Sequence, residues 1–152
     1  MASWRQQALI AAPVEEVWEL LTDWNHYSEW NRDVIEVTGP PAALERGSTF
    51  EMKTRGPLGL KATTPYRVEE FEEMREMKIQ CQVSGFYVHY LLTDARGSAF
   101  AEVELGVERM EGLQARATGA MHTKGYLRRA VEQTIDNLRS AVGRSRERSS
   151  AT

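Results

Sequence analysis

The stretch that decides the fold is EMKIQCQVSGFYVHYLLTDARGSAFAEVELGV, residues 76–107. Apolar and polar residues alternate over residues 76–83 and again over residues 100–107, a pattern typical of strands with one buried face. The dipeptide Ser84-Gly85 and the tetrapeptide at 94–97 (DARG) are turn signals between these runs. The stretch therefore predicts antiparallel strands that are connected by tight turns.

The middle run of this stretch, residues 86–93, is apolar or aromatic on both faces. Its alternation therefore does not say which face is buried. Two registers remain open: one buries Val88, Tyr90 and Leu92, and the other buries Tyr87, His89 and Leu91. The choice decides whether a histidine faces the interior.

The flanking sequence adds further strands and helices. Strands are predicted at 3–11, 34–37, 49–54 and 60–70, and Pro65 places the last of these at an edge or beside a bulge. A helix is predicted from Pro13, because Val14, Val17, Trp18 and Leu21 form one apolar stripe. A second short helix is predicted at 27–32.

The end of the chain is predicted to be one long helix. Its apolar stripe is made of Leu127, Val131, Ile135, Leu138 and Val142. Gly143 is expected to end it, and residues 144–152 are expected to form a basic, disordered tail. The order of elements predicts a single α+β domain over residues 1–143, in which about seven antiparallel strands are covered by the long helix.

Composition narrows the functional classes. The 152 residues fit one domain, and the net charge of −3 does not indicate nucleic-acid binding. A single cysteine, Cys81, excludes an intramolecular disulfide, and neither a signal peptide nor an apolar run of about 20 residues is visible. We therefore expect a cytoplasmic protein without a membrane span. Aromatic residues around Trp24, Tyr27 and Trp30 are expected to be exposed and could pair in a homodimer.

Two segments resemble a known family. Residues 10–23 (IAAPVEEVWELLTD) with 27–30 (YSEW), and the closing helix 127–142, are similar to the START-like (SRPBCC) superfamily, in its polyketide cyclase/dehydrase-like branch. The resemblance implies a helix-grip fold, in which a curved sheet wraps the last helix and encloses a cavity. It also favours the register that buries Val88, Tyr90 and Leu92. The family includes lipid carriers, plant hormone receptors, polyketide aromatase/cyclases and quinone-binding proteins, so the fold does not choose an activity.

An apolar small molecule is the expected partner. In this fold the cavity is lined by the inward face of the sheet and the underside of the last helix, which predicts as ligand-binding residues Phe50, Met52, Tyr66, Ile79, Cys81, Val88, Tyr90, Val103, Met121, Leu127 and Val131. Tyr66 and Tyr90 could donate hydrogen bonds to a ligand oxygen. The basic residues of these strands alternate with the inward-facing residues and are expected to point outward: Lys53, Arg55, Lys61 and Arg67.

Few residues suggest catalysis. The candidates for acid-base chemistry are Tyr66, Tyr90 and His89, while His122 is expected to be exposed to solvent. The histidines and Cys81 lack the spacing of a metal site, and no cofactor motif is present, so neither a metal nor a cofactor is expected.

Three hypotheses follow. The first is a carrier or sensor that binds a lipophilic molecule, such as a lipid or polyketide, in an enclosed apolar cavity. The second is a polyketide cyclase or aromatase that acts on a poly-ketone chain through tyrosine and histidine side chains. The third is a domain with a filled core that acts by protein contact and has no cavity large enough for a ligand. The sequence leaves open whether any reaction is catalysed.

Overall fold

A seven-stranded antiparallel sheet forms most of the molecule, with the strand order β1-β7-β6-β5-β4-β3-β2. The computed structural model describes residues 2–39, 43–108 and 122–150. The strands are β1 (Ser3–Ile10), β2 (Val34–Thr38), β3 (Thr49–Arg55), β4 (Lys61–Glu72), β5 (Glu76–Cys81), β6 (Phe86–Ala95) and β7 (Ser98–Val107). The helices are α1 (Val14–Thr22), η1 (Trp24–His26), α2 (Tyr27–Trp30), η2 (Pro57–Gly59) and α4 (Lys124–Ser150).

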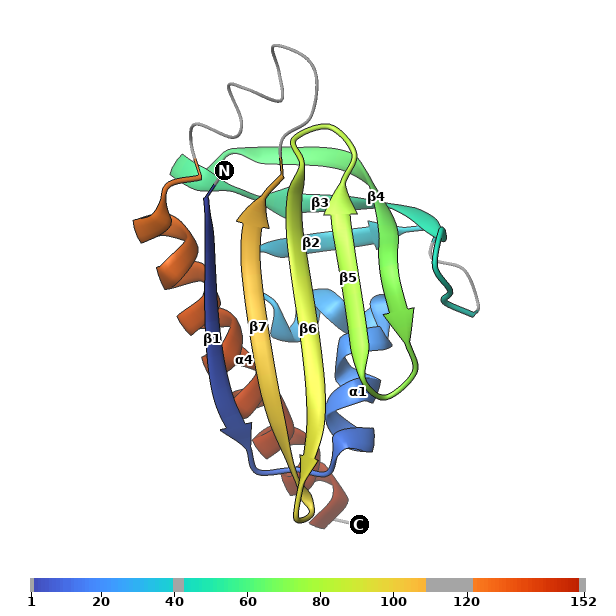
Figure 1. Ribbon diagram of the computed structural model, residues 1–152. Coiled ribbons are helices and arrows are strands. Elements are labelled where there is room, and N and C mark those ends of the chain that lie inside the picture. The colour runs from blue at the N-terminus through green and yellow to red at the C-terminus, as the bar shows by residue number, and fades with distance from the viewer. Residues whose placement is uncertain (1, 40–42, 109–121, 151–152) are drawn as a thin grey trace.

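The sheet curves around α1, η1, α2 and α4, which pack on one of its faces (Figure 1). The long helix α4 contacts the edge strand β1 and its neighbour β7, and α1 contacts β6 and β7. This arrangement confirms the α+β helix-grip architecture that the alternating strands and the long helix predicted.

The register of β6 resolves the ambiguity at residues 86–93. Val88, Tyr90 and Leu92 belong to the hydrophobic core between the sheet and the helices. His89 and Leu91 alternate with them and therefore lie on the outer face. The register implied by the family resemblance is confirmed.

The edge position expected for Pro65 is wrong, because β4 is an inner strand between β3 and β5. The pairing of β4 with β5 does contain a register shift, between Val68 and Glu70. Pro65 is tolerated there because its carbonyl accepts a hydrogen bond from the Gln82 N–H at 2.8 Å, beyond the last residue of β5. A residue with an N–H at position 65 would donate it toward Gln82, which lies beyond the end of β5. Proline therefore removes no hydrogen bond from within the ladder between β4 and β5.

Helix α4 begins at Lys124 and continues through Gly143 to Ser150. The expected frayed tail therefore begins as helix, because Gly143 is not among the residues of positive φ that would end it. At the other end, the Thr123 Oγ1 accepts a hydrogen bond from the Tyr126 N–H at 3.2 Å, which caps the first turn.

The aromatic residues of the short helices are buried, which corrects the expectation that they are exposed. Trp24, Tyr27 and Trp30 all belong to the core. The Trp24 ring lies 4.8 Å from Tyr27 and 4.9 Å from Phe50. These side chains hold η1 and α2 against the inner face of the sheet and leave no aromatic surface for a dimer contact there.

Candidate functional site

A cavity of about 570 Å³ lies between the inner face of the sheet, α2 and the first turns of α4. Apolar side chains from the sheet form much of its wall, among them Met52, Ile79, Cys81, Val88 and Leu105. They line it because alternate residues of a strand share one face. The volume is within the range of sites that hold drug-sized molecules, about 300–1,000 Å³.

Two tyrosine hydroxyls meet inside this cavity. The Tyr27 hydroxyl, from α2, lies 2.7 Å from the Tyr90 hydroxyl, from β6. Burial, opposed by hydrogen bonds with Tyr90 and Asn31, raises the pKa of Tyr27 to about 12. Burial and the neighbouring Tyr27 also raise the pKa of Tyr90 well above its usual value. Both phenols are therefore neutral near pH 7 and act as hydrogen-bond donors and acceptors rather than as bases.

Tyr66 adds a third hydroxyl to the wall. Its ring stacks on Phe50 with a centroid separation of 6.1 Å. Burial, with a smaller contribution from Cys81, raises the pKa of Tyr66, and hydrogen bonds with Thr54 and Thr64 oppose that rise. Tyr66 also remains neutral at physiological pH.

Six of the predicted ligand-binding residues line the cavity, and four others are buried outside it. The six are Met52, Tyr66, Ile79, Cys81, Val88 and Tyr90. The four are Phe50, Val103, Leu127 and Val131, which belong to the core but are not part of the cavity wall. Met121 lies outside the described residues.

Helix α4 explains two of these differences. Tyr126, Ala130 and Thr134 are four residues apart and present one stripe to the cavity. Leu127 and Val131 lie on the neighbouring stripe, which is fully buried in the core. The helix thus presents the first stripe to the cavity, and Leu127 and Val131 do not border it.

One end of the cavity, which we call the mouth, is bordered by exposed charged residues. Asp33, Arg55 and Lys61 line it there. This corrects the expectation that Arg55 and Lys61 lie away from the cavity on the outer face of the sheet. Partial desolvation raises the pKa of the Asp33 carboxyl, and the nearby Arg55 guanidinium opposes that rise.

His122 also lines the cavity and is only 7% exposed, so the expectation that it faces solvent is wrong. Its ring stacks on Phe86 at 5.0 Å and meets the edge of Tyr126 at 5.5 Å. A histidine just before a helix gives no pattern from which burial could have been inferred. His122 lies four residues before Tyr126, and Tyr126 also lines the cavity.

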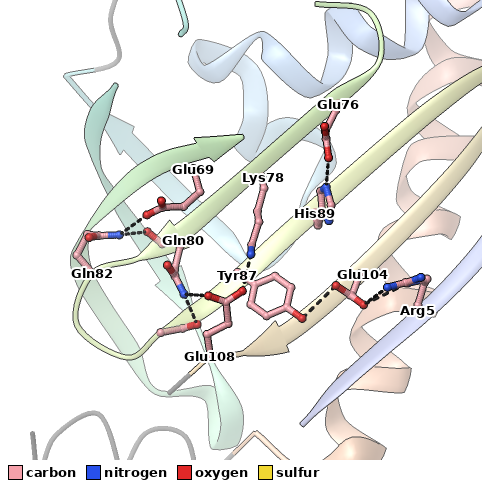
Figure 2. A network of polar contacts seen from close by, with 11 residues as sticks. Arg5, Glu69, Glu76, Lys78, Gln80, Gln82, Tyr87, His89, Glu104 and Glu108 are labelled. Atoms are coloured by element: carbon pink, nitrogen blue, oxygen red, sulfur yellow. Dashed lines mark hydrogen bonds and ion pairs between the residues drawn. The ribbon is translucent and has the colours of Figure 1, made fainter. Parts of the chain in front are cut away.

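His89 lies on the opposite side of the sheet, within a polar network that Figure 2 shows. Its Nε2 is 2.7 Å from a Glu76 carboxylate oxygen. On the same face the Tyr87 hydroxyl donates to Glu104 at 3.0 Å, and Arg5 pairs with that carboxylate at 2.9 Å. The sheet therefore separates His89 from the cavity. His89 was one of the predicted catalytic residues, and it cannot act on a ligand inside the cavity from this position.

The described residues contain no group of three or more His, Cys, Asp or Glu that could hold a metal ion. Within the same ranges, no helix has the length and apolar character that crossing a membrane requires.

Comparisons with known proteins agree with this geometry. The family described as polyketide cyclase/dehydrase and lipid transport matches residues 1–143. No curated protein gives a significant match.

Solved structures share the fold at low sequence identity. A START superfamily protein from Mycobacterium smegmatis superposes with a TM-score of 0.73 and 16% identity, over 95% of this chain and 99% of that one. A protein from Thermus thermophilus has a TM-score of 0.70 and 14% identity, over 94% and 98% of the two chains. The ZhuI aromatase/cyclase from Streptomyces sp. R1128 has a TM-score of 0.67 and 12% identity, over 93% of each chain.

Proposed function

Because the chain belongs to the polyketide cyclase/dehydrase and lipid transport family, we propose that it binds a lipophilic small molecule in the cavity, as a carrier or sensor. The observation that carries the proposal is a cavity of about 570 Å³ with a largely apolar wall and a pair of tyrosine hydroxyls inside. Burial of apolar ligand surface supplies affinity at about 25 cal/mol per Å². The existence of this cavity contradicts the third hypothesis, a domain with a filled core.

The polar groups of the interior favour a ligand that carries a neutral oxygen. When two hydroxyls share one hydrogen bond, one proton joins them and the other remains available for a further acceptor. The raised pKa values of Tyr27 and Tyr90 keep that proton in place at physiological pH. A carbonyl, ether or hydroxyl oxygen of the ligand would accept it.

A polyketide cyclase or aromatase is the second candidate, and His122 is the residue that favours it. His122 borders the cavity, while the other histidine candidate, His89, is paired with Glu76 on the outer face. A general base works best when its pKa is near the working pH, so the interior tyrosines are poorly suited to form an enolate. We therefore place binding before catalysis.

The first test is mass spectrometry of an organic extract of the purified protein, beside an unrelated protein prepared identically. We expect a co-purifying lipophile in near-stoichiometric amount. A titration with the fluorescent apolar probe N-phenyl-1-naphthylamine then measures binding directly. Failure of this probe to bind, together with an empty extract, would contradict the proposal.

A matched pair of variants places the ligand on the correct face of the sheet. Tyr90→Phe removes the hydroxyl inside the cavity, and Tyr87→Phe removes the one on the outer face. For an oxygen-containing ligand found in the extract, we expect Tyr90→Phe to weaken binding by about fivefold to tenfold, the worth of one hydrogen bond. Tyr87→Phe should leave the affinity unchanged; the reverse result would place the ligand outside the cavity. Turnover of a poly-ketone substrate that is lost in His122→Gln would instead support the cyclase.

A further inference from the structure

The hairpin that connects β3 and β4 carries two leucines that face solvent. Leu58 is 90% exposed and Leu60 is 58% exposed. No other large apolar side chain in the described residues is as exposed as either, the next being Leu9 at 55%. A single exposed apolar residue needs no explanation, but two at the tip of one hairpin indicate an interaction site.

The hairpin tip, residues 56–60, has a defined conformation. The Gly56 N–H donates to the Leu60 carbonyl at 2.8 Å, and the Gly59 N–H donates to the Gly56 carbonyl at 3.1 Å. Leu58 has φ +62°, a left-handed conformation that glycine or asparagine adopts more readily. A glycine or asparagine at position 58 would fit the backbone better, and a polar side chain would fit the exposure better. The stability of the turn therefore does not explain why a leucine is present there.

The strands that lead to this tip are basic. Residues 52–67 contain four Lys or Arg and no acid, although the whole chain has a net charge of −3. Arg55 and Lys61 are direct partners in the register of β3 and β4. Like charges placed directly opposite each other destabilise a sheet, and the Asp33 carboxyl near Arg55 offsets part of this repulsion.

The hairpin tip also borders the mouth of the cavity. Gly56, Leu60 and Lys61 line the cavity together with Tyr126 from the first turns of α4. In Figure 1 the hairpin end of β3 and β4 lies at the same end of the molecule as the start of α4. Any surface that contacts Leu58 and Leu60 is therefore adjacent to the cavity.

We propose that the β3–β4 hairpin tip docks this protein onto the surface of an anionic lipid bilayer. Leu58 and Leu60 enter the boundary between headgroups and acyl chains, while Arg55 and Lys61 contact the acidic headgroups. Two leucines offer far less area than the roughly 800 Å² per partner that a stable protein interface buries. Shallow insertion with cationic neighbours is sufficient for reversible membrane binding. This inference goes beyond the proposed function and does not depend on which ligand the cavity holds.

Co-sedimentation with vesicles tests it. Wild-type protein should bind vesicles of 70% phosphatidylcholine and 30% phosphatidylserine, and bind pure phosphatidylcholine much more weakly. The double variant Arg55→Gln/Lys61→Gln should lower the partition coefficient on the acidic vesicles by about fivefold for each cation. The variant Leu58→Asn/Leu60→Ser should lower it by about tenfold or more, because both apolar contacts are lost.

Matched controls separate the hairpin tip from general surface properties. Leu9→Ser removes an exposed leucine from β1, and Arg46→Gln removes an exposed cation outside the hairpin. Both controls should bind the acidic vesicles like wild type. The proposal is overturned if wild type does not bind these vesicles, or if the hairpin variants bind as well as the controls do.

A second measurement reports insertion directly. Cys81 is a free thiol in the cavity wall, so Leu58→Cys is made together with Cys81→Ala, which leaves one thiol for the environment-sensitive dye NBD. Addition of acidic vesicles should increase and blue-shift the emission of the dye at this position, while a dye at Leu9→Cys should not respond. Equal responses at both positions would show that the hairpin tip is not the docking site.

Discussion

Tyr87 and Tyr90 are on the same strand, and their hydroxyls lie on opposite faces of the sheet. The Tyr90 hydroxyl meets the Tyr27 hydroxyl inside the cavity, and the Tyr87 hydroxyl donates to the Glu104 carboxylate outside it. The Tyr90 hydroxyl is thus bonded to a neutral group, and the Tyr87 hydroxyl to a charged one. The difference shows that the two faces of β6 border different environments. The inner face borders a cavity suited to an apolar ligand, and the outer face borders a network of charged side chains.

The outer face reinforces this division with a connected network (Figure 2). Lys78 pairs with Glu108 and also lies 4.6 Å from the centre of the Tyr87 ring. Glu108 accepts a further hydrogen bond from Gln80 at 3.2 Å. Lys78 and Glu108 are partly exposed, so their ion pair is screened by water and contributes little by itself.

The largest effect is expected when a charge is placed on the inner face. Val103 is fully buried in β7, so Val103→Asp should lower the free energy of unfolding by roughly 3–5 kcal/mol. Urea unfolding followed by circular dichroism measures the change. Thr93→Asp, at an exposed position of β6, should change stability by no more than about 0.5 kcal/mol. Equal losses in the two variants would contradict the division between the faces.

Alkaline pH should also act on the inner face. Burial raises the folded-state pKa of Tyr27 from 10.0 to about 12, so above pH 10 the unfolded chain releases a proton that the folded protein still holds. Stability is therefore complete below pH 10 and falls as the pH rises toward 12, by roughly 2–3 kcal/mol for Tyr27 alone. Urea unfolding at several pH values measures this slope. The variant Tyr27→Phe/Tyr90→Phe should show a flatter dependence, and an identical slope would rule out this origin.

A methyl group at Gly106 should disturb the outer face. A Cβ there would lie 2.5 Å from the Tyr87 hydroxyl oxygen, because the tyrosine ring covers this glycine. Gly106→Ala should displace the ring from Glu104 and cost roughly 1–3 kcal/mol. A double-mutant cycle with Tyr87→Ala measures the coupling between the two residues. Additive losses would show that the ring has room to move.

The smallest effect is expected at the contact between the His89 and Glu76 side chains. Both side chains are partly exposed on the outer face, so His89→Gln should change the free energy of unfolding by less than about 1 kcal/mol. The affinity for N-phenyl-1-naphthylamine should be the same as in wild type. A large loss of affinity would connect this histidine with the cavity and contradict the separation of the two faces.

The order of elements could be predicted from the sequence, because alternation in β5 and β7 and the stripe on α4 are strong signals. The inner face of β6 could not be predicted from its own residues, since both of its faces are apolar or aromatic, and only the family resemblance indicated it. The stripe of α4 that borders the cavity could not be chosen for a similar reason: Ala130 and Leu127 are both apolar, and only packing decides which one borders the cavity. Tyr27 escaped notice because its partner, Tyr90, is 63 residues away.

The pairing of β1 with β7 has a consequence for how the chain folds during synthesis. Every residue of β1 has its partner in β7, and Arg5 and Glu104 are 99 positions apart. At roughly 5–20 residues per second, β1 leaves the ribosome some 5–20 s before β7 does. Contacts of such long range also place the protein among the slower folders, on a scale of milliseconds to seconds. The sheet is therefore completed only after its last strand has been made, and until then β1 is an unpaired edge that a chaperone or a neighbouring nascent chain can contact.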